Sequence, residues 1–300
     1  MRVNPNIVSS VVADLNQSQS TLNTLLQEVA TGKSVNQPSD NPTAAAQMVN
    51  NTLETANVDR YTQNISSALT QVQQAGSVLS SVVTSLTQAV SLGTEGANGT
   101  NNSTSLSALA QQVQSILSTV VSQANSAIGG VYIFGGTATS TAPYTADPSS
   151  PTGYTYNGNN NANSVAVGDN LNVPTTLPGS QIFSHSSNSV IGSLSSLVAA
   201  LQNGNGSQIS SATTAVSSSI QTVSQAQGFY SNAANQLNAQ ENYLQKETVT
   251  LTTQQNDLVG ADMATVATEL GQAEISNSAA MAAAGRVLPN TLLNYLPPPA

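Results

Sequence analysis

Apolar residues recur at alternating spacings of three and four at both ends of this chain. In the first 30 residues this heptad stripe is broken only by Gln19, and its apolar members are Val8, Val12, Leu15, Leu22, Leu26 and Val29. Near the other end a second stripe comprises Val259, Met263, Val266, Leu270, Ala273, Asn277, Ala280, Ala284 and Val287. Such spacing is typical of the seam of a coiled coil. Neither end has an obvious partner inside the chain, so we expect assembly rather than chemistry.

Composition excludes several kinds of functional site. The chain has no Cys, which excludes disulfides, thiol catalysis and zinc–thiolate sites. Its single histidine, His185, cannot form a His pair or a His-based metal cluster, and we interpret it as a loop residue. Only 5 Lys and Arg stand against 14 Asp and Glu, too few bases for a nucleic-acid or anionic-membrane surface. We therefore expect no catalytic residue, no metal and no cofactor.

The N-terminal residues give no sign of a secretory signal or a membrane anchor. Met1 to Ile7 lack the apolar core of a secretory signal peptide. No continuous apolar run approaches the ~18 residues of a membrane span. We expect neither general secretion nor membrane insertion, and the alternatives are cytoplasmic residence or export by a route that reads no cleavable signal.

Helix and turn signals predict a mainly α fold with a small β insertion. Gly32 stops the first helix, and Asn41 followed by Pro42 starts the next one as N-cap and first helical residue. The predicted segments are an N-terminal assembly helix and linker, disordered in the monomer (1–40), a long helical hairpin (41–128), a β-rich outer domain (129–187), a returning helical rod (188–258), and a C-terminal assembly helix and tail (259–300).

The helical hairpin and the β-rich segment have distinct patterns. The first helix of the hairpin carries a stripe that we interpret as the core face of an intramolecular bundle: Ile65, Leu69, Val72, Gly76, Leu79, Val83, Leu86 and Val90. Short alternating runs broken by Gly, Asn and Pro predict β-hairpins between residues 129 and 187. Helices on both sides of this insertion imply that the two ends of the chain run side by side, while the middle projects outward.

Several motifs resemble the family of flagellar hook-associated protein 3, which is related to flagellin. They are Thr31-Gly32-Lys33 followed by Pro38-Ser39-Asp40-Asn41-Pro42, the run from Val131 to Thr137, the run from Asp262 to Leu270, and Leu292-Leu293-Asn294-Tyr295-Leu296. The resemblance covers residues 1–92 and 240–296 well and the middle loosely. This chain departs from the family pattern at Asn41, where a second Asp is common, and at Leu293, where Phe is usual.

The resemblance implies a flagellin-like fold, with coiled-coil layers of terminal helices, a long α-hairpin rod and an outward β domain. It implies a structural subunit, not an enzyme, of the junction between flagellar hook and filament. The implied partners are other copies in a ring, the first hook-associated junction protein, flagellin, and an export chaperone on the C-terminal helix. The implied location is the extracellular flagellum, reached through the flagellar type III system. Subunit contacts are expected at the terminal stripes and at Leu292 and Leu293.

Two other functions stay open. A flagellin would build the filament itself, although flagellins typically carry paired Asp and Gly where this chain has Pro38 to Pro42. An extracellular glycan-binding module would use a platform of tyrosines, but a small β core accounts for the same residues: Tyr132, Tyr144, Tyr154 and Tyr156. Gly32-Lys33-Ser34 is similar to the end of a P-loop but lacks the upstream Gly and the preceding strand, so we reject a nucleotide site.

Overall fold

The computed structural model describes residues 7–184 and 189–293, with side chains described for 9–184 and 189–285. The chain forms two compact units. The terminal unit comprises the described residues up to Asn57 and from Glu247 onward, and the central unit comprises those between Val58 and Lys246. Two long helices, α2 (Pro42–Gly96) and α6 (Gly206–Val259), contribute to both units. The division between the units therefore falls within helices, whereas the predicted segment boundaries at residues 40 and 259 fall next to loops.

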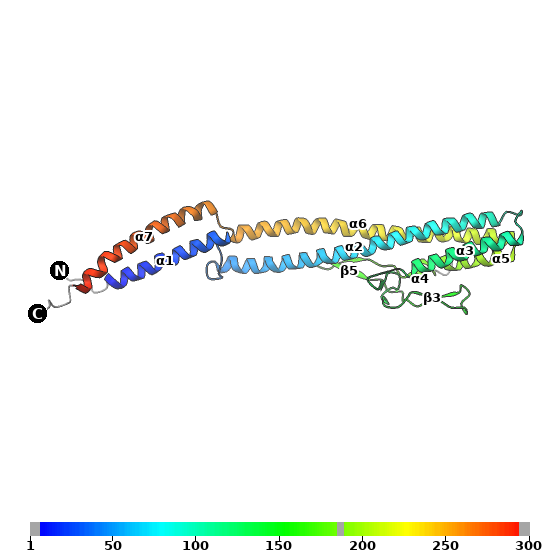
Figure 1. Cartoon of the computed structure of the whole chain (residues 1–300), viewed down its shortest axis with the longest axis horizontal. Helices are drawn as coiled ribbons and strands as arrows, with labels where there is room; N and C mark the ends of the chain where they lie inside the picture. Colours follow the sequence, from blue (N-terminus) through cyan, green and yellow to red (C-terminus); the bar gives the residue numbers. More distant parts are fainter. Residues whose placement is uncertain (1–6, 185–188, 294–300) are drawn as a thin grey trace. The chain divides into compact units, whose positions relative to one another are not determined.

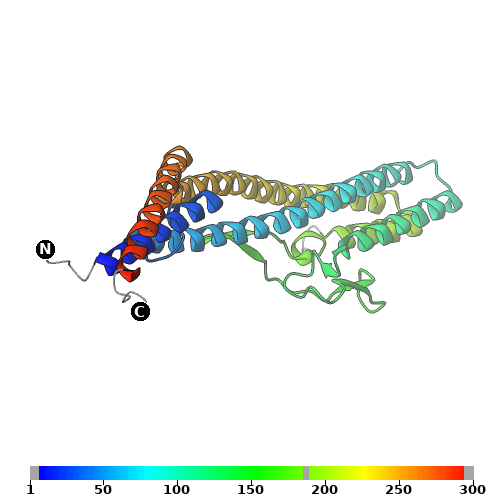
Figure 2. The ribbon, with the colours of Figure 1, turned by 60° about the vertical axis from the view of Figure 1, so that its left-hand side comes forward.

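In the terminal unit, α1 (Ile7–Thr31) packs against α7 (Met263–Leu293), as Figures 1 and 2 show. The prediction that the two ends of the chain run side by side is confirmed. The expectation that neither end has a partner inside the chain is wrong, because each helix covers one side of the other. Two helices with one apolar face each can bury those faces together once the topology brings them antiparallel.

In the central unit, α2 buries an unbroken heptad stripe and runs antiparallel beside α6 (Figures 1 and 2). The stripe consists of Val58, Tyr61, Ile65, Ala68, Val72, Ala75, Leu79, Val82, Leu86 and Ala89. The buried stripe of α6 has the same spacing: Ile209, Ala212, Val216, Ser219, Val223, Ala226, Tyr230, Ala233 and Leu237. In both helices, larger residues mostly alternate with Ala or Ser. This alternation lets the two surfaces interlock at short distance.

Half of the stripe predicted for α2 is wrong. Ile65, Val72, Leu79 and Leu86 are buried as predicted, but the other four members are only partly buried. Their places in the core are taken by the residue before each of them, so that Ala68 replaces Leu69 and the same shift occurs along the helix. Successive residues lie about 100° apart on a helix, so the predicted and the observed residues lie on two neighbouring faces. Both of these faces are apolar in α2. The packing of α6 decides which of the two faces is buried.

Two shorter helices complete the helical part of the central unit. α3 (Ser103–Ala124) packs against α5 (Val190–Asn203), and both lie beside the ends of α2 and α6 (Figure 1). Gly93 of α2 lies so close to α6 that an added Cβ would overlap the Thr213 hydroxyl. α3 begins after Asn102, its N-cap, and ends at Ala124, short of the predicted limit of the helical hairpin at residue 128, because the chain enters a β-hairpin.

The β-rich segment consists of hairpins, as predicted. They are β1 (Ala127–Ile128) with β2 (Val131–Tyr132), β3 (Tyr144–Ala146) with β4 (Tyr154–Tyr156), and β5 (Ser164–Gly168) with β6 (Leu171–Pro174); the short helix α4 (Gly179–Ile182) follows. Among the described residues, these three pairs do not join into one sheet.

The third hairpin is attached to the long helices by side-chain hydrogen bonds. The Tyr61 hydroxyl of α2 donates to the Asp169 carboxylate at 2.8 Å. Asn64 of α2 donates to the Ala166 carbonyl at 2.9 Å, and Gln240 of α6 donates to the Val167 carbonyl at 3.0 Å. The bonds from Asn64 and Gln240 satisfy backbone carbonyls that a neighbouring strand would otherwise pair. The hairpin therefore lies along the helices of the central unit, and its outward position in an assembly stays a prediction.

Within the described part of the chain, α2 is the one helix long and apolar enough to cross a membrane by those two criteria. Core helices that never enter a membrane pass the same test. The buried apolar stripe of α2, from Val58 to Ala89, packs inside the central unit, and the other faces of the helix carry many Ser, Thr and Gln residues. We interpret α2 as a core helix.

Candidate assembly surfaces

The stripe predicted near the C-terminal end is the side of α7 that faces α1. Val266 and Ala284 are each 5% exposed. Leu270, Ala273 and Ala280 are partly buried. Met263 departs from the prediction, because its side chain is 44% exposed at the first residue of α7.

The covered side of α1 is displaced by one residue from the predicted stripe. Leu25 is buried and Val11 and Ser18 are partly buried, whereas the predicted residues Val12, Leu26 and Val29 are exposed. Leu15 and Leu22 are partly buried and border both faces. Sequence reasoning missed Val11 and Leu25, although each lies one heptad, seven residues, from Ser18. α1 consequently keeps an apolar side that α7 does not cover.

The two polar members of the predicted stripes are bonded to each other. The Asn277 side-chain amide of α7 donates to the Gln19 side-chain oxygen of α1 at 3.1 Å. The bond lies on the exposed border of the contact between the two helices, and a specific polar pair favours one register over its neighbours. The pair therefore aligns α1 with α7.

The α1–α7 pair has one polar and one apolar flank. A groove of about 420 Å³ on one flank is lined mainly by polar side chains: Ser18, Thr21, Glu269, Gln272 and Ser276. The apolar flank carries Val12 and Leu26 of α1 and Met263 and Met281 of α7, which are between 44% and 57% exposed. Helical spacing in an antiparallel pair puts these four residues on the flank opposite to the groove. The apolar flank is the first candidate for subunit contact.

Four predicted contact residues lie outside the described side chains. They are Val8, Val287, Leu292 and Leu293, for which the structure gives a helical backbone only. His185 lies outside the described residues altogether. The roles of these residues stay predictions.

The linker after α1 is joined to the turn between α6 and α7. The Ser34 N–H donates to the Val259 carbonyl at 2.8 Å, and the Ala261 N–H donates to the Gly32 carbonyl at 3.0 Å. Val35, Ala44 and Val259 form a small buried cluster beneath these bonds. Gly32, with φ of +67°, ends α1 in the left-handed conformation that favours glycine.

The polar residues of the predicted family motif have structural roles in this linker. The Asp40 carboxylate accepts the N–H groups of Asn36 and Gln37 at 3.0 and 2.8 Å. The Asn41 side-chain oxygen accepts the N–H of Ala44 at 3.1 Å and so caps α2. An amide oxygen caps a helix about as well as a carboxylate. The departure from the family pattern at Asn41 therefore preserves the cap.

Asp262 caps α7 in a similar way. Its carboxylate accepts the Ala264 N–H and the Thr265 hydroxyl, each at 3.0 Å. The Thr265 hydroxyl, followed by the N–H groups of the first turn, lowers the pKa of Asp262 below its ordinary value. The cap fixes where α7 begins and hence which of its residues face α1.

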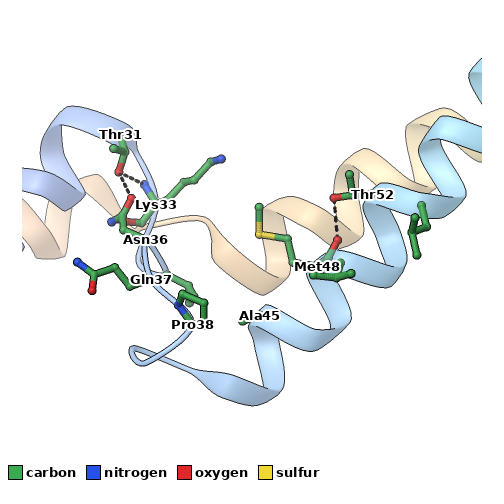
Figure 3. A pocket seen from close by; sticks show the side chains of 11 residues that line it. Thr31, Lys33, Asn36, Gln37, Pro38, Ala45, Met48 and Thr52 are labelled. Atoms are coloured by element: carbon green, nitrogen blue, oxygen red, sulfur yellow. Dashed lines mark hydrogen bonds between the residues drawn. The ribbon is translucent and has the colours of Figure 1, made fainter.

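A second candidate surface, which we term the linker groove, lies between the linker and the start of α2 (Figure 3). Its volume is about 660 Å³, and its lining comprises Thr31, Lys33, Val35, Asn36, Gln37, Pro38, Ala45, Met48, Val49, Thr52 and Leu53. Val49 and Leu53 are 60% and 61% exposed, unusually high for large apolar residues. The sequence showed no signal for this groove, because it arises from the fold of the linker back onto α2.

Two of the four tyrosines proposed for a sugar platform, Tyr144 and Tyr156, make contacts inside the β-rich segment. Tyr144 is 3% exposed, its ring packs against Tyr156 and Phe183, and its hydroxyl bonds with Ser184. Burial raises the pKa of the Tyr144 phenol above its ordinary value. The Tyr156 hydroxyl donates to the Phe134 carbonyl. Two of the four tyrosines thus belong to the core of the β-rich segment, and no group of three or more His, Asp or Glu suited to a metal occurs among the described residues.

Comparison with known proteins agrees with this architecture. Residues 3–139 match the family model of the bacterial flagellin N-terminal helical region. The fold is flagellin-like. The structure of Bacillus cereus FlgL is similar, with a TM-score of 0.60 at 23% identity over 69% of this chain and 99% of that chain. The flagellar junction protein FlgL from Legionella pneumophila has a TM-score of 0.60 at 14% identity over 71% of this chain and 100% of that one.

Curated relatives are similar over a shorter range. Flagellar hook-associated protein 3 of Escherichia coli (strain K12) is 34% identical over 122 residues, which is 40% of this chain and 38% of the relative. The protein of the same name from Salmonella typhimurium is 34% identical over 134 residues, or 42% of its own length. The matched part thus spans about two fifths of these relatives. The resemblance indicated by the sequence motifs is confirmed.

Proposed function

We propose that this chain is a structural subunit of the junction between hook and filament in a bacterial flagellum, and that it assembles through the helices at its two ends. The observation that carries this proposal is the apolar flank of the α1–α7 pair. After α7 has covered one side of α1, Val12, Leu26 and Val29 are still exposed. Large apolar patches left open on a water-facing surface mark sites of protein contact. The similarity to hook-associated protein 3 supports the flagellar setting.

Further elements of the proposal follow from the family resemblance. The subunits form a ring, bound on one side to the first hook-associated junction protein and on the other to flagellin. The chain leaves the cell through the flagellar type III system without a cleaved signal peptide, with a chaperone on its C-terminal helix. Its role is structural and not enzymatic, and its contact residues include those of the terminal stripes.

A charged residue on the apolar flank tests the proposal. In Leu26→Glu we expect the purified monomer to keep its helix content, because Leu26 is 44% exposed, and we expect loss of incorporation into flagella. Thr24→Glu is the matched control, since Thr24 is exposed and lies about 200° around α1 from Leu26. Cells that produce only the Leu26→Glu variant should carry hooks without filaments. Normal filaments on those cells would refute the proposal.

A flagellin is the second candidate, because the matched family model describes flagellin itself. Deletion of the gene separates the two functions. Loss of a junction subunit leaves hooks in place and releases flagellin monomers into the medium. Loss of a filament subunit removes the major protein of the filament, with no such release.

A further inference from the structure

The linker groove combines an apolar surface with a cation, Lys33. Val49 and Leu53 form an exposed apolar wall, and Lys33 extends from the linker at the rim (Figure 3). Within the described part of the chain, no ion pair is found for the Lys33 ammonium. The chain has 14 acids and 5 bases, so acidic partners are plentiful elsewhere on its surface. A groove of this kind suits an apolar segment that carries an acid.

The exposed side of α1 does not have this combination. Val12 and Leu26 are exposed on the apolar flank. Asp14 and Glu28 each follow one of them by two residues, which is about 200° around the helix. The acids of α1 therefore point away from its exposed apolar residues.

The exposed side of α7 does have it. Ile275 and Met281 are 67% and 57% exposed. Two rows with spacings of three and four run through Ser278, and together they define what we term the α7 face: Glu274, Ile275, Ser278, Met281 and Ala282, all exposed. Glu274 and Met281 are one heptad apart and hence on the same side of the helix. The acid and the apolar residues share one surface.

We propose that the linker groove of one subunit binds the α7 face of a second copy, with Ile275 and Met281 against Val49 and Leu53, and Glu274 paired with Lys33. This inference rests on the proposed function and names the contact between subunits. The two surfaces of one chain do not meet. Glu274 lies eleven residues beyond Met263, or about 16 Å along α7, whereas Lys33 pairs with Gly260 just before that helix.

A charge swap tests the ionic part of the contact. We expect Lys33→Glu and Glu274→Lys each to lower the ratio of incorporated to exported full-length subunit at least tenfold, and the double variant to restore at least half of it. Export is measured in the growth medium, which separates assembly from any effect on chaperone binding. The helix content of each purified monomer serves as a check on folding. Single variants that assemble normally, or a double variant no better than the singles, would overturn the proposal.

Disulfide formation tests the apolar part, and the Cys-free chain makes the reading unambiguous. With Val49→Cys and Met281→Cys together, mild oxidation of isolated flagella should link subunits into dimers and longer chains, and dilute monomer should not be linked. Val49→Cys with Gln272→Cys is the matched control, because Gln272 lies on the polar flank. Equal linking in both variants contradicts the proposed contact. If Leu26→Glu abolishes assembly while both tests of the groove fail, the proposed function stands and this inference falls.

Discussion

Single polar residues at the two loops of the terminal unit act through the backbone. Asp40, Asn41 and Asp262 each accept N–H groups that the ends of α2 or α7, or the linker, leave without a partner. Such caps are predictable from the sequence, because Asp or Asn stands directly before a run of helix-forming residues. The position of the capped helix ends relative to each other is not predictable from the sequence. It depends on hydrogen bonds such as those between Ser34 and Val259, which join residues far apart in the chain.

The pKa of Asp262 gives a prediction at this scale. In the folded chain the Thr265 hydroxyl lowers this pKa below the ordinary value of 3.8, so the cap stabilises α7 above that pH and the contribution is lost as pH falls through the lower folded-state pKa. We expect NMR titration of the carboxyl carbon to give a value below 3.8. The protection factor of the Ala264 amide, which is the exchange rate corrected for its intrinsic pH dependence, should fall in the same range. Asp262→Asn should abolish the pH dependence of that protection factor. An Asp262 pKa at or above the ordinary value would contradict the cap.

At the scale of elements, helix boundaries followed closely from sequence, while the choice of buried face did not. α1 ends and α2 begins at the predicted residues because Gly32, Asn41 and Pro42 act locally. In α1 and in α2 the buried stripe lies beside the predicted one, since each helix has two adjacent apolar faces. Only the neighbouring helix decides between them.

The small residues in the α2 core give the second prediction. Ala75 is fully buried beside α6, so Ala75→Leu should lower the free energy of unfolding by about 1–3 kcal/mol through overpacking. Ser77→Leu adds the same side chain at an exposed position two residues later and should change stability by less than ~0.5 kcal/mol. Urea unfolding followed by circular dichroism measures both. Equal unfolding midpoints for the two variants would show that α2 does not approach α6 closely at this position.

The β-hairpins illustrate the same limit. Gly, Asn and Pro at the turns predicted where the strands occur. The attachment of the third hairpin to the helices involves Asn64 and Gln240, whose side chains donate to carbonyls of β5. These two donors lie 176 residues apart in the sequence, so no local pattern shows them together.

At the scale of the whole molecule, the two units differ in the size of their cores. The buried apolar residues of the terminal unit are few and include Leu25, Val35, Ala44, Leu251, Val259, Val266 and Ala284, whereas the central unit buries most of the large aliphatic and aromatic side chains. Free energies of local opening scale with buried apolar contact. We expect the free energy of opening of the terminal unit to be well below the free energy of global unfolding of the central unit.

Limited proteolysis of the dilute monomer tests this difference. Trypsin and chymotrypsin should remove about 40 residues from the N-terminal end and about 50 from the C-terminal end, since exposed, weakly packed ends are cut first. Lys33 in the linker should be cut before Arg60 and Lys246, which lie within long helices. Mass spectrometry over time identifies the fragments, and assembled flagella provide the comparison in which the ends are protected. Ends as resistant as residues 58–246 in the dilute monomer would contradict the expected disorder of the free termini.

The sequence by itself determined the order of the helices and most of their limits, the position of the β insertion and the presence of apolar stripes at both ends, because these depend on residues within a few positions of each other. Tertiary structure alone decided that α1 and α7 cover each other, that their apolar flank stays open, and that the linker folds into a groove beside Val49 and Leu53. The physical reason is that these helices carry two neighbouring apolar faces, about 100° apart, whose aliphatic side chains would gain nearly equal free energy on burial. Which one is buried depends on the partner that the fold brings to it.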